Sequence, residues 1–365
     1  MTIFGQKYFM QPRNKPEGAG AFMTQAKQHN SNLDLVRLLA VFLVFVVHLG
    51  QGFSWIGEWS AVGAKGVLLF FVLSGYLISQ SIDNSVSWKD YFKKRILRIL
   101  PAYYIVLILM YLWDLLQYTV AWGFSEALEG PCHPLKYLRY FGFLQVILPE
   151  PDYTLWCNRY ALWTMSSFAV FYLVAYPLRK MVKKYWQMLV LLFIFMVSRD
   201  AMLEGVQDVL NSLLPYVDGY YAHHTPLTML YCFLFGTTLH YAVKEKKEFS
   251  YLFIMATILV VGQFTWYRFE MIFTILLYLA LKAPDLLAEG RSKRLIQMAG
   301  DGSFSFYLCH MMIFSMLDYV VKRLPLGDLG DMIVSIATTI LAGYGLWWFA
   351  VRPVERWLQR KLKKT

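Results

Sequence analysis

Charged side chains are scarce in this sequence. Of its 365 residues, 16% are Asp, Glu, Lys or Arg, whereas 58% are hydrophobic. A soluble domain of this size carries far more charge, so the composition excludes one and indicates an integral membrane protein. The basic residues outnumber the acidic ones, 35 to 24, but they cluster between apolar runs. Such clusters are typical of membrane topology, and we therefore predict no nucleic-acid partner.

Several motifs that define other protein classes are missing. No cluster of Cys and His has the spacing of a zinc site, so we predict no metal. The serine of "VLSGY" lies in an apolar run without a Gly-x-Ser-x-Gly elbow, which argues against a serine hydrolase. The internal repeats found in many transporters are not evident. Residues 1–31 lack the apolar core and cleavage site of a signal peptide, so we interpret them as a cytosolic, flexible leader.

Ten apolar segments approach the length of about 20 residues that crosses a bilayer. They lie at residues 33–50, 62–82, 97–118, 161–177, 186–198, 228–243, 250–265, 269–281, 303–321 and 332–351. Basic clusters fall on alternate connections between these segments, as the positive-inside rule requires. The sequence thus predicts an all-α, multi-pass integral membrane protein with about ten transmembrane helices and both termini in the cytosol. We assign one membrane domain to residues 32–355 and a basic cytosolic tail to residues 356–365.

Two cysteines, Cys132 and Cys157, lie in the long external loop predicted between the third and fourth segments. A disulfide between them is compatible with an oxidising compartment. The sequence does not show whether their Cα atoms come close enough, so the bridged and the reduced states both stay open.

The first apolar segment, "NLDLVRLLAVFLVFVVHLG", carries polar side chains that a simple anchor does not need. Arg37 and His48 are eleven residues apart, which places them on one helical face, about 16 Å apart along the axis. Asp34 is close enough on the same helix to pair with Arg37. Two interpretations stay open. Either Arg37 reaches the headgroups and His48 bonds a neighbouring helix, or the face is a functional site in which His48 moves protons.

A second polar cluster, "YFKKRILRILPAYY", opens the third apolar segment. Arg95 and Arg98 are neighbours on one helical face, and two guanidinium groups in that arrangement suit a phosphate-bearing ligand. The alternative is a positively charged flank that orients the segment in the membrane. That alternative accounts better for Lys93 and Lys94, although Lys94 is kept as a third candidate contact.

Four segments are similar, in this order, to the signatures of the acyltransferase family 3 membrane proteins, which include O-antigen and exopolysaccharide O-acetyltransferases. They are "NLDLVRLLAVFLVFVVH", "GVLLFFVLSGYLIS", "YFKKRILRILPAYY" and "GSFSFYLCHMMI". The resemblance spans about residues 32–355 and implies about ten spans in a bacterial inner membrane. It implies transfer of an acyl group, with acetyl expected first, from cytosolic acyl-CoA to a hydroxyl of an extracytoplasmic or lipid-linked glycan. O-antigen, capsule, exopolysaccharide and peptidoglycan precursor all stay open as acceptors, and so does the oligomeric state.

The resemblance also implies roles for individual residues. Arg37 and His48 match an Arg-x10-His element, in which His48 is the catalytic residue, either a general base or a transient acyl carrier. Arg95 and Arg98, together with Lys94, are expected to bind the phosphates of acetyl-CoA at the cytosolic mouth. The other candidates are Asp34 beside Arg37, His310 as a secondary catalytic residue, and Ser303, Tyr307 and Trp163 as substrate contacts. The acceptor is expected to arrive from the outer side, near residues 119–160.

The "GVLLFFVLSG" element is interpreted as close helix packing, since small residues such as Gly66 and Gly75 let helices approach. Two departures from the family pattern suggest a divergent branch. Phe168 stands where a carboxylate is expected, and the closing Glu-Arg-Pro of relatives is replaced by Val351-Arg352-Pro353. We expect no appended soluble esterase-like domain. A non-catalytic or transport partner in polysaccharide export stays open as the alternative function.

Overall fold

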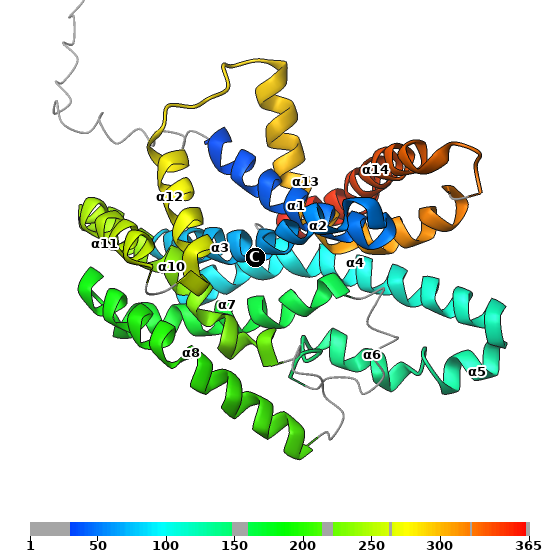
Figure 1. Ribbon diagram of the computed structural model, residues 1–365, viewed down its shortest axis with the longest axis horizontal. Coiled ribbons are helices and arrows are strands. Elements are labelled where there is room, and N and C mark those ends of the chain that lie inside the picture. The colour runs from blue at the N-terminus through cyan, green and yellow to red at the C-terminus, as the bar shows by residue number, and fades with distance from the viewer. Residues whose placement is uncertain (1–29, 148–159, 214–221, 263–264, 322, 363–365) are drawn as a thin grey trace, which may run out of the picture. The chain divides into compact units, whose positions relative to one another are not determined.

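The computed structural model describes residues 30–147, 160–213, 222–262, 265–321 and 323–362, and every regular element in these ranges is helical (Figure 1). The residues from Ser31 onward form one compact unit. The predicted all-α fold is therefore confirmed. Cys157 lies outside the described residues, so whether it pairs with Cys132 stays open.

Each predicted apolar segment overlaps one main helix, and residues 263–264 of the seventh segment lie outside the described residues. These helices are α1 (Ser31–Gly52), α3 (Gly66–Asp83), α4 (Trp88–Trp122), α7 (Trp163–Met181), α8 (Tyr185–Leu213), α10 (Pro226–Lys244), α11 (Glu248–Val261), α12 (Arg268–Lys282), α13 (Arg291–Val321) and α14 (Gly327–Leu346). Shorter pieces join them, namely α2 (Gly57–Ser60), α5 (Phe124–Glu129), α6 (Pro134–Phe141) and α15 (Arg352–Leu362). A π-helical turn, Trp347–Val351, links α14 to α15.

Four stretches of the described chain are long and apolar enough to cross a membrane by length and composition. They are Ser31–Gly50, Ala61–Asp83, Trp88–Trp122 and Gly327–Lys361. The number of spans and the cytosolic placement of both termini stay predictions. The membrane character of the chain rests on these helices, because their apolar surfaces need a hydrocarbon environment.

Several helices continue well beyond their apolar segments. The helix α4 begins at Trp88, nine residues before the predicted span, because Ser87 caps its first turn by accepting a hydrogen bond from the Asp90 N–H at 3.2 Å. Its 35 residues rise about 52 Å, more than the thickness of a bilayer core. The helix α13 likewise begins with the polar sequence "RSKRLIQMAGDG" before its predicted span. Hydropathy locates the apolar part of a helix and omits such polar turns.

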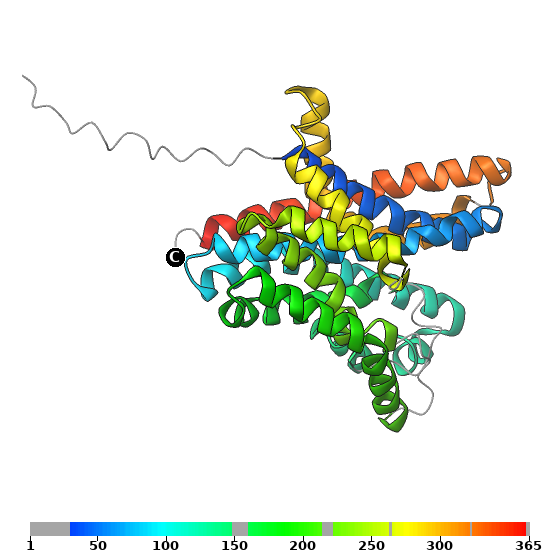
Figure 2. The same cartoon turned by 60° about the vertical axis from the view of Figure 1, so that its left-hand side comes forward.

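The helix α1 packs against α3, α12 and α13 (Figure 2). It runs parallel to α13, because Asp34 lies beside Gly300, Phe45 beside Phe306 and His48 beside His310. The helices α3 and α10 are also parallel, since Gly75 contacts Phe233 while Asp83 pairs with Lys244. Alternate crossing requires the first and ninth segments, and the second and sixth, to run in the same direction. The packing directions are therefore compatible with the predicted topology.

Asp83 joins the ends of three helices. Its carboxylate accepts hydrogen bonds from Arg179 of α7 at 2.9 Å, and from His240 and Lys244 of α10 at 3.0 and 2.5 Å. Asp83 is partly buried at the end of α3, and these partners compensate for the contact with water that its carboxylate has lost.

The backbones of α3 and α10 touch at two glycines. A Cβ atom added to Gly236 would lie 1.7 Å from the carbonyl oxygen of Val72, and one added to Gly75 would lie 2.0 Å from that of Phe233. Gly66 similarly approaches the carbonyl oxygen of Ala40 in α1. The interpretation of this element as close helix packing is confirmed, because no side chain larger than hydrogen fits at these contacts.

We expect Gly236→Ala to destabilise the protein, because the new methyl group must push two helix backbones apart. The free energy of unfolding should fall by at least roughly 1–3 kcal/mol, the usual cost of inserting extra atoms into a packed core. Gly345→Ala in α14 is the matched control, since a Cβ there meets nothing within 4 Å. It should be neutral or gain about 0.5–1 kcal/mol from helix propensity. Thermal unfolding of the two purified variants in detergent measures the difference, and equal melting temperatures would contradict the packing.

Candidate functional site

Two histidines meet between α1 and α13. The ring centroids of His48 and His310 are 5.2 Å apart, and the side chains are 6% and 1% exposed. The Nδ1 atom of His310 is 2.6 Å from the carbonyl oxygen of Tyr307, which can only accept, so Nδ1 carries the hydrogen. The Nε2 atom of His310 is buried and makes no hydrogen bond within the described residues. This nitrogen is therefore a buried proton acceptor beside a second imidazole.

Aromatic rings surround the histidine pair. The ring of His310 contacts those of Phe45 and Phe306, each at a centroid distance of 6.0 Å, and that of Tyr307 at 5.9 Å. The Tyr307 hydroxyl lies 3.0 Å from the Thr164 hydroxyl and donates to the Ala161 carbonyl at 3.2 Å. Tyr307 thus ties α13 to the start of α7. The pair sits in a largely apolar shell, where a proton transfer would proceed with little competition from water.

The predicted substrate contacts Trp163 and Ser303 are both buried. Trp163 packs edge-to-face on His224 at 4.3 Å and on Phe71 at 6.1 Å. The Ser303 hydroxyl donates to the Gly300 carbonyl at 2.6 Å, within its own helix. These contacts account for both side chains by packing, and their role toward a substrate stays a prediction. Phe168, at the place of the missing carboxylate, likewise packs on Phe71 at 5.1 Å.

The predicted pairing of Arg37 with Asp34 is confirmed. Nη1 of Arg37 lies 2.6 Å from Oδ1 of Asp34, and the Asp34 side chain is fully buried. Gly300 faces this carboxylate, because a Cβ there would lie 2.8 Å from Oδ1 of Asp34. Arg37 also interacts electrostatically with Arg98 of α4 and Asp301 of α13. The ion pair therefore lies where α1, α4 and α13 come together.

A cavity of about 520 Å³ opens between α4, α13 and α15. Five basic side chains line it against two acidic ones, which leaves a clear excess of positive charge. The basic residues are Lys94, Arg95 and Arg98 from α4 with Arg352 and Arg356 from α15, and the acidic ones are Asp301 and Glu355. Arg95 contributes a buried Nε that makes no hydrogen bond within the described residues. We call this space the basic cavity. Its donors suit a ligand with phosphate groups.

Lys94 has a local partner as well as a place in the basic cavity. Its ammonium group lies 2.7 Å from Asp90 and 3.3 Å from the Asn84 carbonyl. This i,i+4 pair fits the helix-flank interpretation of the lysines, whereas in the described part of the chain Arg95 and Arg98 form no ion pair with an acid of α4.

One helix connects the basic cavity to the histidine pair. Asp301, Phe304 and Ser305 of α13 line the cavity. His310 follows Ser305 by five residues, about 7.5 Å along the helix axis. The cavity and the histidine pair therefore lie at neighbouring levels of α13, on faces about 140° apart around its axis.

The sequence missed the contribution of the C-terminal helix. We assign residues 356–365 to a basic cytosolic tail from the sequence, yet Arg356 and Gln359 line the basic cavity together with Arg352 and Glu355. The signal was present in the spacing, since Arg352, Arg356 and Gln359 follow one another at i, i+4 and i+7 on a single helical face.

A buried acid was missed as well. Glu270 of α12 is 1% exposed and accepts a hydrogen bond from the Tyr231 hydroxyl at 3.1 Å. Its Oε2 makes no hydrogen bond within the described chain. It lies among α10 and α12, and none of the described contacts links it to the histidine pair.

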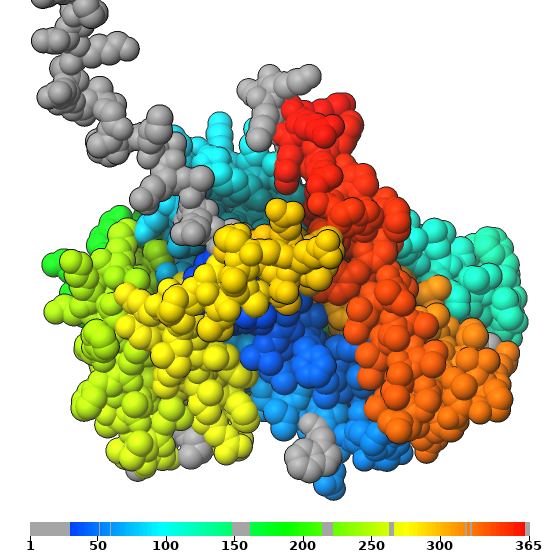
Figure 3. Space-filling model, turned by 90° about the horizontal axis from the view of Figure 1, so that it is seen from above, coloured from blue at the N-terminus to red at the C-terminus, as the bar shows by residue number. Residues whose placement is uncertain are grey.

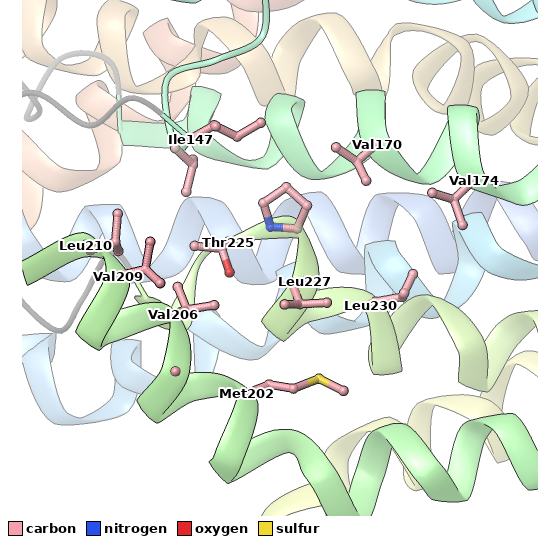
Figure 4. Close-up of a pocket in the computed structure, with 13 residues that line it drawn as sticks. Ile147, Val170, Val174, Met202, Val206, Val209, Leu210, Thr225, Leu227 and Leu230 are labelled. Atoms are coloured by element: carbon pink, nitrogen blue, oxygen red, sulfur yellow. The ribbon is translucent and has the colours of Figure 1, made fainter. Parts of the chain in front are cut away.

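A larger cavity, of about 660 Å³, lies between α7, α8 and α10 (Figure 4). Val170, Val206 and Leu230 are typical of its lining, and Thr225 supplies its hydroxyl. That hydroxyl already bonds the Ala222 carbonyl and the Thr228 side chain. None of the described residues that line this cavity is ionisable, so they offer no group to move a proton or hold a phosphate, and the basic cavity is the better candidate.

Comparison with known proteins gives a family. The chain matches a family model described as "Acyltransferase domain" over residues 30–350. It is 24% identical to an O-acetyl transferase of Shigella phage Sf6 over 331 residues, which are 87% of this chain and 94% of that protein. No solved structure matches the chain.

Two further relatives match over a shorter stretch. The putative peptidoglycan O-acetyltransferase YrhL of Bacillus subtilis is 34% identical over 99 residues, 26% of this chain and 15% of YrhL. The peptidoglycan O-acetyltransferase OatA of Listeria monocytogenes is 32% identical over 95 residues, 24% of this chain and 14% of OatA.

Replacing Asp34 by Asn should destabilise the protein, because it leaves the Arg37 guanidinium without its buried counter-charge. Breaking a buried ion pair typically costs about 3–5 kcal/mol. The control Asp90→Asn removes the same charge from the exposed pair with Lys94, which should cost about 0.3–0.5 kcal/mol. Thermal unfolding in detergent compares the two. If Asp34→Asn were as mild as the control, the pair would not be a structural element of the site.

Proposed function

The chain belongs to this acyltransferase family, and we propose that it transfers an acetyl group, or another short acyl group, from acyl-CoA to a hydroxyl of a glycan. One observation carries the proposal: a buried pair of histidines lies less than three helical turns from a cavity lined by arginines. Acyl transfer needs a base at the acceptor hydroxyl and a hold on the donor, and these two features supply them.

The basic cavity is proposed as the binding site for the donor. CoA carries a diphosphate and a ribose phosphate, and each guanidinium presents a planar fork of N–H donors that matches phosphate oxygens. Arg95 and Arg98 face the cavity from α4. Arg37 interacts electrostatically with Arg98, although it does not itself line the cavity. The phosphates would stay here while the thioester extends along α13.

The histidine pair is proposed to handle the proton. The hydrogen bond from His310 Nδ1 to the Tyr307 carbonyl holds that ring in one tautomer, so proton uptake by His310 occurs at Nε2. In direct transfer, His48 takes the proton from the acceptor hydroxyl, the oxygen bonds to the thioester carbonyl carbon, and the C–S bond breaks. The proton then passes to the departing CoA thiolate. In the covalent route, a nitrogen of His48 attacks the same carbon, and the C–S bond breaks to release the CoA thiolate. The acceptor oxygen then bonds to the acyl carbon as the C–N bond to His48 breaks, and the acceptor proton passes to the thiolate.

The acceptor is proposed to be a glycan. The phage relative is named as an O-acetyl transferase, and two shorter matches are named as peptidoglycan enzymes. O-antigen, capsule, exopolysaccharide and a lipid-linked peptidoglycan precursor share the required hydroxyl. We place the protein in the bacterial cytoplasmic membrane, with the acceptor arriving from the outer side and both termini in the cytosol.

We expect His48→Ala to abolish most of the transfer while binding of CoA stays normal, because His48 acts on the proton and the phosphates bind elsewhere. A positioned general base contributes about 10²–10⁴-fold in rate. Transfer of labelled acetyl groups to glycan in membranes, at matched protein levels, measures the loss. His223→Ala, which changes an exposed histidine, is the control. Transfer by His48→Ala at the wild-type rate would overturn the assignment.

Arg95→Gln and Arg98→Gln should each weaken the binding of CoA. Hydrogen bonds to charged groups contribute about 1.5–3 kcal/mol, which corresponds to roughly a ten- to hundredfold change in Kd. Lys93→Gln is the matched control, because it removes one positive charge from the same turn of α4 without lining the cavity. Calorimetry on the purified protein compares the three variants. Equal effects from all three would indicate general electrostatic attraction and not a built site.

A further inference from the structure

The C-terminal helix α15 forms one wall of the basic cavity. The π-helical turn Trp347–Val351 widens the helix just before Pro353, and the Arg352 N–H bonds the Trp347 carbonyl across this turn. The following helix packs on α4, and Figure 3 shows the red C-terminal helix beside the cyan of α4. Residues more than 250 positions apart in the sequence therefore face each other across one space.

The arginines of α15 are sorted by their position on the helix. Arg352 and Arg356, one turn apart, line the cavity, together with Gln359 on the same face. Arg360 is exposed and does not line the cavity, and Lys361 lies over the ring of Trp357 at 4.4 Å. Two guanidinium groups thus point toward the cavity, whereas two other cations of the same helix lie outside it.

Arg352 is held in position by aromatic rings. Its guanidinium lies 3.9 Å from the ring centroid of Trp348 and 5.2 Å from that of Trp347. Such stacking orients the plane of the group and leaves its N–H donors at the edge. Glu355, between the two arginines, interacts electrostatically with Arg98 of α4, so α15 and α4 are coupled across the cavity.

We propose that α15 supplies the second half of the phosphate site, with Arg352 and Arg356 binding donor phosphates opposite Arg95 and Arg98. This rests on the proposed function, in which the donor is an acyl-CoA. The nucleotide end of the donor would then lie between two helices that are far apart in sequence, and its phosphates would offset the repulsion among the four guanidinium groups. A membrane-surface role for α15 is less suited to these two residues, because they line a cavity that the other cations of the helix avoid.

The test uses the full-length protein in nanodiscs of phosphatidylcholine, with Arg356→Gln as the main variant. Arg356 is exposed, so its replacement should leave folding intact. Arg360→Gln, four residues further along the same helix, is the matched control. Two donors separate the nucleotide contacts from the rest of the site: acetyl-CoA, and acetyl-pantetheine, which lacks the nucleotide. Binding of adenosine 3′,5′-bisphosphate is measured in parallel.

For Arg356→Gln we expect the Kd of the bisphosphate and the KM for acetyl-CoA to rise roughly tenfold or more, as for the loss of a charge-assisted hydrogen bond. The kcat/KM for acetyl-pantetheine should stay unchanged, and Arg356→Lys should restore part of the binding. If the variant instead lost structure in general, kcat/KM would fall equally for acetyl-CoA and acetyl-pantetheine, and that result would overturn the proposal.

Other outcomes also overturn it. If Arg356→Gln and Arg360→Gln had the same Kd for the bisphosphate, the position of Arg356 in the cavity would not matter for phosphate binding. If Arg356→Gln changed activity only in nanodiscs with anionic lipid, α15 would bind headgroups and not the donor. If the wild-type protein used neither donor and bound no bisphosphate, the proposed function itself would fail. That result is distinct from a wild-type enzyme whose Arg356 variant is normal.

Discussion

The contact between α1 and α13 determines how this protein places its polar groups. The two helices run parallel, with Asp34 against Gly300 at one end and His48 against His310 further along. Each of these contacts buries a group that is costly to remove from water, so each must find its partner at the same register. A shift of one residue along either helix would separate the two histidines. It would also place Asp34 against a residue with a side chain, where Gly300 now leaves room for the carboxylate. The interface therefore has one favourable alignment.

The register at this contact also orders the rest of the site. Since α13 carries Asp301 and Ser305 into the basic cavity and His310 to the histidine pair, the proposed phosphate site and the proposed reacting groups lie along one helix. Arg37, paired with Asp34, extends the same arrangement onto α1. The distance between the histidine pair and the arginines of the basic cavity therefore depends on helix geometry and not on loops.

The departures from the family pattern have a structural counterpart. Phe168 lies in an aromatic cluster with Phe71 and Tyr172, so a carboxylate at that position would be surrounded by rings. Glu270 is a buried acid elsewhere in the bundle, but it is bonded to Tyr231 and lies among α10 and α12. The chemistry proposed here accordingly assigns the proton to the imidazoles alone. The helix that follows Val351 keeps its arginine, and that residue lines the cavity.

The sequence by itself determined the all-helical fold, the positions of the apolar segments, and the pairing of Asp34 with Arg37. These follow from composition and from spacing within one helix, which are local properties. The resemblance to a family added His48, His310, Arg95 and Arg98 as candidates. Only the tertiary structure decided that His48 meets His310, that Tyr307 orients that ring, and that α15 joins α4 around one cavity. Contacts between helices depend on how whole surfaces pack, and one helix's pattern of residues does not contain the surface of its partner.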